Sequence, residues 1–245
     1  MPLLLVLHGA GGTAASMVRH TGLAELGVAR GYAVVHPEGI DRRWNDGRNP
    51  TAAHDDVGFM RTLLDSLTHE LPVDTTRIYA AGISNGAGMA YRLACDLPGR
   101  LAAVAAVAGA PAAGLEDRCG RTLPVSLIVF QGTHDPLMPY DGGITAVRRG
   151  QVLSAERTAA IFASVNSCPP TAVTSFEPDT ATDGTRVRRT RYDGCPEGRD
   201  VVLYSIEGGG HTWPGGPPVG RRVGRVTRDI HASRAILDFF DRHPE

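Results

Sequence analysis

The chain has 245 residues, of which 42% are hydrophobic, and this is enough for one large folded unit with a substantial buried core. Its formal net charge is −1, so a basic face that binds nucleic acid or a membrane surface is not expected. No apolar run reaches the roughly 18 residues that a membrane-spanning helix needs. We therefore expect a single domain over residues 1–245 that binds neither nucleic acid nor a membrane.

Short apolar runs alternate with stretches of helical periodicity along most of the chain. Runs of strand length occupy residues 3–7, 32–36, 77–81, 103–108 and 125–130. Apolar residues at helical spacing predict helices over residues 55–71, 86–97, 151–165 and 228–240. Continuous apolar runs are typical of parallel strands that are covered on both faces. The pattern therefore predicts an α/β fold, with a mostly parallel central sheet and helices on both faces.

Three parts of the chain have other features. Residues 1–7 lack the basic segment and the small-residue cleavage site of a secretion signal, so we expect a buried strand of a mature or trimmed chain. Residues 185–192 and 201–206, joined by a glycine-containing connection, predict an antiparallel hairpin at one edge of the sheet. Residues 169–184 are polar and rich in turn formers, and we expect an irregular surface segment there. The solvated side of the hairpin is expected to carry Arg186, Arg188, Arg189 and Arg191.

A serine flanked by glycines follows the third predicted strand and precedes a predicted helix. The motif is Gly82-x-Ser84-x-Gly86. Gly-x-Ser-x-Gly alone is a weak pattern, but between a strand and a helix it is typical of a sharp turn that presents a nucleophilic serine. The glycines let the strand and helix backbones approach closely. The alternative interpretation is an ordinary glycine-rich turn.

A serine hydroxyl needs a general base to become nucleophilic at neutral pH. His211 lies in a glycine-rich segment directly after the last predicted strand, and it is the expected base. Asp135 follows the predicted strand 125–130 and is the expected acid, which would hold the tautomer of the imidazole. Asp141, further along the same loop, is the rival candidate. The chain order serine, acid, histidine fits this kind of nucleophile turn.

Residues in the segments that follow the first, second, third and last predicted strands suggest the remaining parts of a site. The backbone N–H groups of Asn85 and Ala10 are expected to stabilise an oxyanion, with Gly11 as the next choice or as a substrate contact. Trp44 and Trp213 could each offer a flat surface to an aromatic acyl group or a polymer chain. For both tryptophans, packing within the loop is the alternative.

Four cysteines are present, and none lies in a Cys-x-x-Cys pair, so a zinc site is not expected. Four cysteines allow three pairings. We favour Cys95–Cys119 and Cys168–Cys195, because each pair brackets a loop-rich stretch. Disulfides would indicate an oxidising compartment, and four buried free thiols are the alternative.

Together these motifs resemble the esterase/polyhydroxybutyrate depolymerase family of α/β-hydrolases, close to bacterial feruloyl esterases of carbohydrate esterase family 1. The matching segments are residues 7–12, 82–86, 132–140 and 208–216. The last, with the sequence GGGHTWPGG, is the most specific. The resemblance implies secretion, a triad of Ser84, Asp135 and His211, and no metal or other cofactor. Family members usually carry a leader and an additional N-terminal strand before the His8-Gly9 loop, and we expect this sequence to lack both.

The function expected from these features is hydrolysis of hydroxyalkanoate polyester, feruloyl or related esters through an acyl-enzyme on Ser84. The substrate is expected to be an ester, possibly within a polymer, and the chain is expected to act as a monomer. Two alternatives remain open. One is a thioesterase or peptidase on the same fold, and the other is a catalytically silent binding domain.

Overall fold

The computed structural model describes residues 1–49, 53–146, 150–218 and 220–244. Within these residues the strands are β1 (Leu3–Leu7), β2 (Ala33–Val35), β3 (Ile78–Ile83), β4 (Ala103–Val107), β5 (Ser126–Gly132), β6 (Gly143–Ile144), β7 (Gln151–Val152), β8 (Val173–Phe176), β9 (Arg186–Tyr192) and β10 (Val201–Glu207). The α-helices are α1 (Ala14–Thr21), α2 (Leu23–Val28), α3 (Asp56–Glu70), α4 (Asn85–Asp96), α5 (Glu116–Cys119), α6 (Ala155–Val165) and α7 (Ala232–Arg242). Short 3₁₀ helices lie at η1 (Ile40–Arg42), η2 (Ala113–Leu115), η3 (Pro196–Gly198) and η4 (Arg221–Val223).

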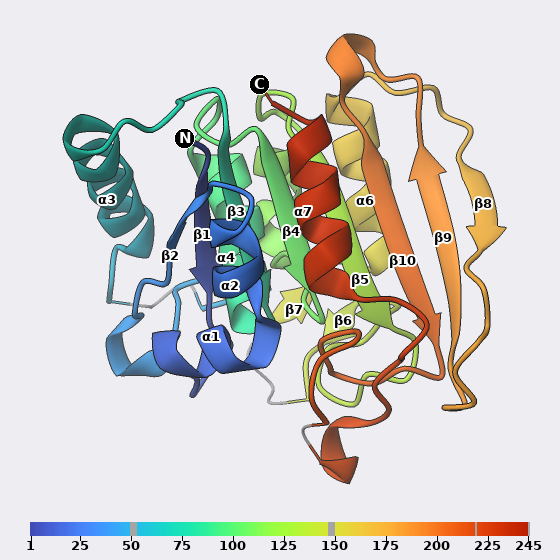
Figure 1. Cartoon of the computed structure of the whole chain (residues 1–245). Coiled ribbons are helices and arrows are strands. Elements are labelled where there is room, and N and C mark those ends of the chain that lie inside the picture. The colour runs from blue at the N-terminus through green and yellow to red at the C-terminus, as the bar shows by residue number, and fades with distance from the viewer. Residues whose placement is uncertain (50–52, 147–149, 219, 245) are drawn as a thin grey trace.

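The central sheet has the strand order β2-β1-β3-β4-β5-β10-β9-β8 in the described part of the chain (Figure 1). Strands β2, β1, β3, β4, β5 and β10 run parallel to one another. The hairpin β9–β10 and its outer neighbour β8 make an antiparallel edge. This arrangement confirms the predicted fold class. It also brings the carboxyl ends of the parallel strands, and the loops that follow them, to one edge of the sheet.

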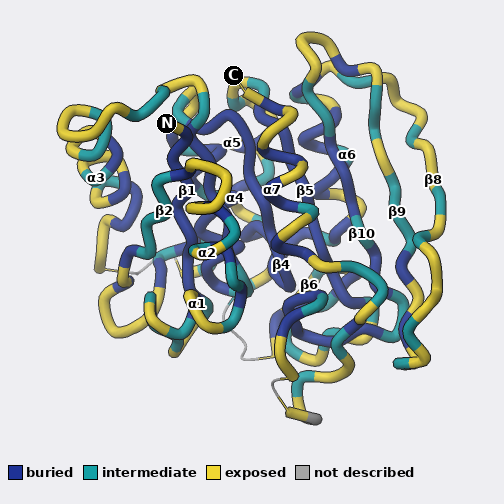
Figure 2. Tube along the Cα trace, viewed as in Figure 1, coloured by how far each residue is buried: buried dark blue, intermediate teal, exposed yellow. Residues whose placement is uncertain are grey.

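Each parallel strand is apolar on both faces because helices cover both faces. Successive strand residues point to opposite sides. Leu3, Leu5 and Leu7 of β1 therefore pack into one apolar cluster with α3, α4 and α6. Leu4 and Val6 pack into a second cluster with α1, α2 and α7. Figure 2 shows the inner strands fully buried, whereas β8 and β9 at the edge are more exposed.

Residues 169–184 correct one expectation, because this polar segment contains the edge strand β8. It pairs with β9 on one side only, so its side chains need not be apolar, and Val173 and Phe176 are exposed. The guanidinium of Arg186 lies 3.8 Å from the centre of the Phe176 ring. A strand of this kind has no alternating pattern of buried residues, which is why the sequence suggested a loop.

The predicted helix over residues 151–165 begins later than expected. Its first residues form β7, which pairs with β6. Helix α6 then begins at Ala155, where the side chain of Ser154 accepts a hydrogen bond from the Arg157 N–H. A serine that caps a helix in this way marks where the helix starts.

Two disulfides join the pairs of cysteines favoured from the sequence. Cys95 near the end of α4 is bonded to Cys119 of α5. Cys168, just after α6, is bonded to Cys195 in the turn after β9. No helix among the described residues has the length and apolar character needed to cross a membrane.

Candidate active site

Ser84 lies at the turn between β3 and α4, in a backbone conformation that an L-residue rarely adopts. Its φ is 57° and its ψ is −118°. Such a conformation is strained and persists only where the surroundings hold it. The Ser84 N–H donates to the Val107 carbonyl at 2.9 Å, and its own carbonyl accepts from the Gly88 N–H at 3.0 Å. The turn therefore lifts the hydroxyl above the end of the sheet.

The glycines around Ser84 are required by close backbone contacts. A Cβ at Gly82 would lie 2.4 Å from the Gly86 backbone, and a Cβ at Gly86 would lie 2.3 Å from the Leu7 carbonyl oxygen. A Cβ at Gly109 would lie 2.6 Å from the Ser84 carbonyl oxygen. Real Cβ contacts are never so short, so a side chain at any of these positions would push α4 away from the sheet.

His211 and Asp135 meet at the same edge of the sheet, although 76 residues separate them in sequence. His211 Nδ1 lies 2.8 Å from Asp135 Oδ2. The carboxylate side chain is fully buried. Its other donors are the Leu137 N–H and the Met138 N–H, each at 2.8 Å, and Gln131 Nε2 at 3.2 Å. A carboxylate on Nδ1 keeps the proton on that nitrogen, so Nε2 is free to accept one.

Asp141, the rival acid, lies elsewhere. Its side chain is exposed, and within the described residues it makes no hydrogen bond to His211. Asp135 ends up at the imidazole because the chain turns immediately after β5. The two backbone N–H groups that follow Asp135 bond to its own carboxylate, which folds the loop back toward β10.

The glycine-rich segment before His211 is explained by the crowding of three backbone segments. Gly208 has a φ of 74°, which favours glycine. A Cβ at Gly210 would lie 2.1 Å from the Val223 carbonyl oxygen. A Cβ at Gly132, in the loop that carries the acid, would lie 2.4 Å from the Gly209 carbonyl oxygen. The loops that carry His211 and Asp135 are therefore packed backbone against backbone.

Two backbone N–H groups near Ser84 have no protein acceptor. Within the described residues, the amides of Ala10 and Asn85 donate to no carbonyl or side chain. Gly11, the next choice from the sequence, does not fit. Its N–H donates to the Arg42 carbonyl at 2.8 Å, and it is not one of the described residues that line the pocket. The turn that supplies this carbonyl is itself strained, with a φ of 52° at Asp41 and 56° at Arg42.

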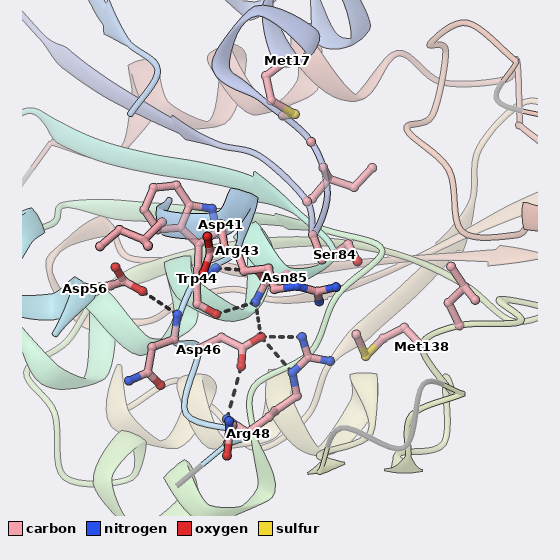
Figure 3. A pocket seen from close by; sticks show the side chains of 18 of the residues that line it. Met17, Asp41, Arg43, Trp44, Asp46, Arg48, Asp56, Ser84, Asn85 and Met138 are labelled. Carbon is pink, nitrogen blue, oxygen red and sulfur yellow. Dashed lines mark hydrogen bonds and ion pairs between the residues drawn. The ribbon is translucent and has the colours of Figure 1, made fainter. Parts of the chain in front are cut away.

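A pocket of about 780 Å³ opens at this edge of the sheet (Figure 3). Ser84, His211 and Ala10 line it together. An apolar part of the wall is formed by Met17, Ile40, Trp44, Leu137, Met138 and Val223. Within the described residues the Ser84 hydroxyl makes no hydrogen bond, and such contacts often tighten only when the substrate binds. No group of three or more potential metal-ligating side chains comes together in the described part of the chain.

The two tryptophans differ in their relation to this pocket. Trp44 lines it, although the side chain is only 4% exposed and also packs in the apolar cluster of α3, α4 and α6. A 2.9 Å hydrogen bond from Nε1 to the His8 carbonyl fixes the edge of its ring. Trp213 is 1% exposed, packs in the apolar cluster of α1, α2 and α7, and does not line the pocket in the described structure. The expectation that Trp213 contacts substrate is therefore wrong, because its ring points away from the site.

Three buried or largely buried polar side chains lie next to the site without having been predicted from the sequence. His8 Nε2 accepts from the Gly39 N–H at 3.0 Å, which joins the Ala10 loop to the Trp44 loop. Asp46 and Arg48 form a buried ion pair behind Asn85. The residue types give little signal, because charged residues in a polar loop are usually solvated. The one available signal was that Asp46 and Arg48 lie close together in the loop that carries Trp44.

A strained serine after a strand, a buried carboxylate on a histidine and an eight-stranded, mostly parallel sheet in the described residues define the α/β-hydrolase fold. The acetyl xylan esterase from Aspergillus awamori has the same fold, with a TM-score of 0.64 at 14% identity over 98% of this chain and 88% of that one. Esterase PE8 gives a TM-score of 0.57 at 15% identity over 97% of this chain and 92% of that one.

The chain belongs to the esterase/polyhydroxybutyrate depolymerase family and is a carboxylic ester hydrolase. The family model described as "Esterase PHB depolymerase" matches residues 1–128. The putative esterase NocK of Nocardia uniformis subsp. tsuyamanensis is 35% identical over 97% of this chain and 73% of NocK. Feruloyl esterase B of Piromyces equi is 32% identical over 86% of this chain and 39% of that protein. Feruloyl esterase D of Neurospora crassa is 28% identical over 97% of this chain and 71% of that protein.

Proposed function

We propose that this chain is a secreted serine ester hydrolase in which Ser84 is the nucleophile, His211 the general base and Asp135 the acid. The observation that carries the proposal is the 2.8 Å contact between His211 Nδ1 and the buried Asp135 carboxylate, at the pocket that Ser84 also lines. A carboxylate in that position holds the imidazole in the tautomer that can take a proton from serine.

The reaction proceeds in two acyl-transfer steps. His211 takes the proton as the Ser84 hydroxyl attacks the ester carbonyl, and the N–H groups of Ala10 and Asn85 stabilise the oxyanion. His211 then protonates the leaving alcohol, which leaves an acyl group on Ser84. Water repeats the sequence on this acyl-enzyme and releases the acid.

The substrates that we propose are hydroxyalkanoate polyesters, feruloyl esters or related esters. A pocket of about 780 Å³ fits the size range of small-molecule sites, and its apolar wall suits an aromatic or aliphatic acyl group. Relatives that are named feruloyl esterases support this substrate class. Secretion is supported by the two disulfides, because such bonds form and persist in oxidising compartments.

The first test is hydrolysis of a short p-nitrophenyl ester by the wild type, by Ser84→Ala and by Ser164→Ala. Ser164 is an exposed residue of α6 and serves as the matched control. We expect kcat to fall about 10⁶-fold in Ser84→Ala and to stay unchanged in the control. Equal rates in the wild type and Ser84→Ala would remove Ser84 from the mechanism. A panel of polyhydroxybutyrate film, methyl ferulate and acetylated xylan would then identify the substrate.

A further inference from the structure

Asn85, which follows the nucleophile, is held by its side chain as well as by its place in α4. Its Oδ1 accepts from the Trp44 N–H at 2.8 Å, and its Nδ2 donates to the Trp44 carbonyl at 2.9 Å (Figure 3). Nδ2 also donates to Asp46 Oδ2 at 2.6 Å. A carboxylate can only accept, so it fixes which end of the amide faces it. The side chain of Asn85 therefore ties the start of α4 to the loop that carries Trp44 in one orientation.

Asp46 is buried, and Arg48 neutralises it. Their side chains are only 5% and 10% exposed. Asp46 Oδ2 accepts from Arg48 Nε at 2.8 Å and also from its Nη2, while Oδ1 accepts from the Arg48 N–H at 3.2 Å. Removing one member of a buried ion pair leaves an uncompensated charge, so each of these charges needs the other.

The pair lies directly against the first turn of α4. A Cβ at Gly88 would lie 2.9 Å from Asp46 Oδ2, so the carboxylate occupies the space that a side chain would need there. Asp46 and Arg48 also line the pocket that contains Ser84. A bare carboxylate at this place would oppose the negative charge that develops on an oxyanion, and the guanidinium cancels it.

We propose that Asp46 and Arg48 are positioning residues for the oxyanion site, acting through Asn85. The inference rests on the proposed function, because it assumes that the Asn85 N–H stabilises the oxyanion. Asp46 fixes the orientation of the Asn85 side chain by accepting a hydrogen bond from Nδ2. The positive charge of Arg48 compensates the Asp46 carboxylate, so that this carboxylate does not repel the oxyanion. A displacement of about 1 Å at such a donor can cost about 100-fold in rate.

The central experiment compares Arg48→Met with the wild type on a short p-nitrophenyl ester. We expect kcat to fall about 100-fold with KM nearly unchanged, because the defect concerns the transition state rather than substrate binding. Arg48→Lys keeps the positive charge and should recover part of kcat. Asp46→Asn/Arg48→Met removes both charges and keeps an acceptor for Asn85 Nδ2, so it should recover kcat by about tenfold over Arg48→Met.

Arg92→Met is the matched control. Arg92 of α4 is also largely buried, pairs with Asp96 and donates to the Asn45 carbonyl of the same loop, but it does not contact Asn85. Loss of this guanidinium should lower the melting temperature and leave kcat unchanged. A fall in kcat equal to that of Arg48→Met would show that loosening of the loop, and not the Asp46–Arg48 pair, is responsible, and would overturn the proposal.

A boronic acid that forms a tetrahedral adduct with serine provides a second readout. Its inhibition constant should rise in parallel with the loss of kcat in Arg48→Met, which a purely structural role would not cause. If Arg48→Met does not fold, Asp46→Ala/Arg48→Met is compared with Asp46→Asn/Arg48→Met, and the variant without the acceptor oxygen should be about tenfold slower. Equal rates in these two double variants would reject the proposal.

Ser84→Ala in the same assays separates this inference from the proposed function. An inactive Ser84→Ala beside an Arg48→Met variant with wild-type kcat and inhibition constant would overturn the positioning role alone. An active Ser84→Ala would overturn the proposed function instead.

Discussion

The loop after β2 that carries Trp44 (the Trp44 loop) and the loop after β10 that carries Trp213 (the Trp213 loop) look alike in sequence. Their tryptophans have different surroundings in the structure. Each loop follows a parallel strand, β2 or β10, and each contains glycine and a single tryptophan. Trp44 lines the pocket, and its backbone pairs with the side chain of Asn85. Trp213 is buried on the far side of its loop, where Nε1 donates to Ser233 Oγ of α7 at 2.9 Å. One tryptophan forms a wall of the site, and the other anchors the loop that carries His211.

Neighbouring residues of an irregular loop can thus face opposite sides of the molecule. His211 faces the pocket, and Trp213, two residues on, enters the apolar cluster of α1, α2 and α7. The Ser233 hydroxyl also donates to the Thr21 carbonyl at the end of α1, so the Trp213 ring is linked through Ser233 to both α7 and α1. In the mechanism that we propose, the Trp213 loop and its neighbour at Asp135 supply catalytic groups, whereas the Trp44 loop supplies part of the pocket wall.

The largest effect on kcat is expected at the proposed catalytic groups next to the Trp213 loop. Asp135→Asn should lower kcat about 10⁴-fold with little change in KM, because an amide no longer holds the proton on His211 Nδ1. Steady-state kinetics on a p-nitrophenyl ester measure this, with Asp141→Asn as the control that keeps wild-type rates. A larger loss in Asp141→Asn would mean that the acid has been assigned to the wrong residue.

A smaller effect should follow when the Trp213 loop is displaced and its catalytic groups are kept. In Gly210→Ala the new methyl group would meet the Val223 carbonyl oxygen, so the loop must shift and His211 with it. We expect about 100-fold lower kcat. Gly114→Ala is the control, because a Cβ there meets nothing within 4 Å. Wild-type kcat in Gly210→Ala would mean that the position of the loop is not critical.

The smallest effects are expected from replacing either tryptophan, and they should differ in kind between Trp44 and Trp213. Trp44→Leu should raise KM for an aromatic ester by roughly fivefold, the equivalent of about 1 kcal/mol of ring contact. Trp213→Leu should leave KM unchanged and cost about 3 kcal/mol of stability, which lowers Tm by roughly 6–12 °C. Kinetics and thermal unfolding are measured on both variants. The opposite pattern, with KM raised only in Trp213→Leu, would reverse the assignment.

The parts of the fold that could be predicted from the sequence are those in which burial imposes a pattern of apolar residues, either periodic or continuous. Strand β1 was located to the residue, because both of its faces are covered and Leu3–Leu7 is apolar throughout. Strand β8 was missed, because an edge strand with exposed side chains carries no such pattern. The start of α6 was misplaced for a related reason, since the cap at Ser154 is a local signal inside a longer apolar stretch.

At the site, local sequence motifs identified candidate residues, but the sequence did not predict the direction in which loop side chains point. Ser84 could be singled out because the close backbone contacts around its turn demand glycines on both sides in sequence. Asp135 was preferred to Asp141 by its distance from the strand end, and the structure brings Asp135 to His211. The orientation of Trp213 could not be predicted, because an irregular turn has no period that assigns a face. The contact of Asp46 with Asn85 could not be predicted either, because it depends on how the Trp44 loop meets the first residue of α4 in space.

Helix α4 is held at both of its ends. Asn85 and the glycine contacts fix the end next to the nucleophile, and the Cys95–Cys119 bond fixes the other. The twelve residues of α4 span about 18 Å. The disulfide therefore does not contact Ser84 and restrains the opposite end of the helix. A chain folded under reducing conditions would lack this covalent restraint at the far end of α4 and would be less stable, whereas the buried contacts along the helix would remain.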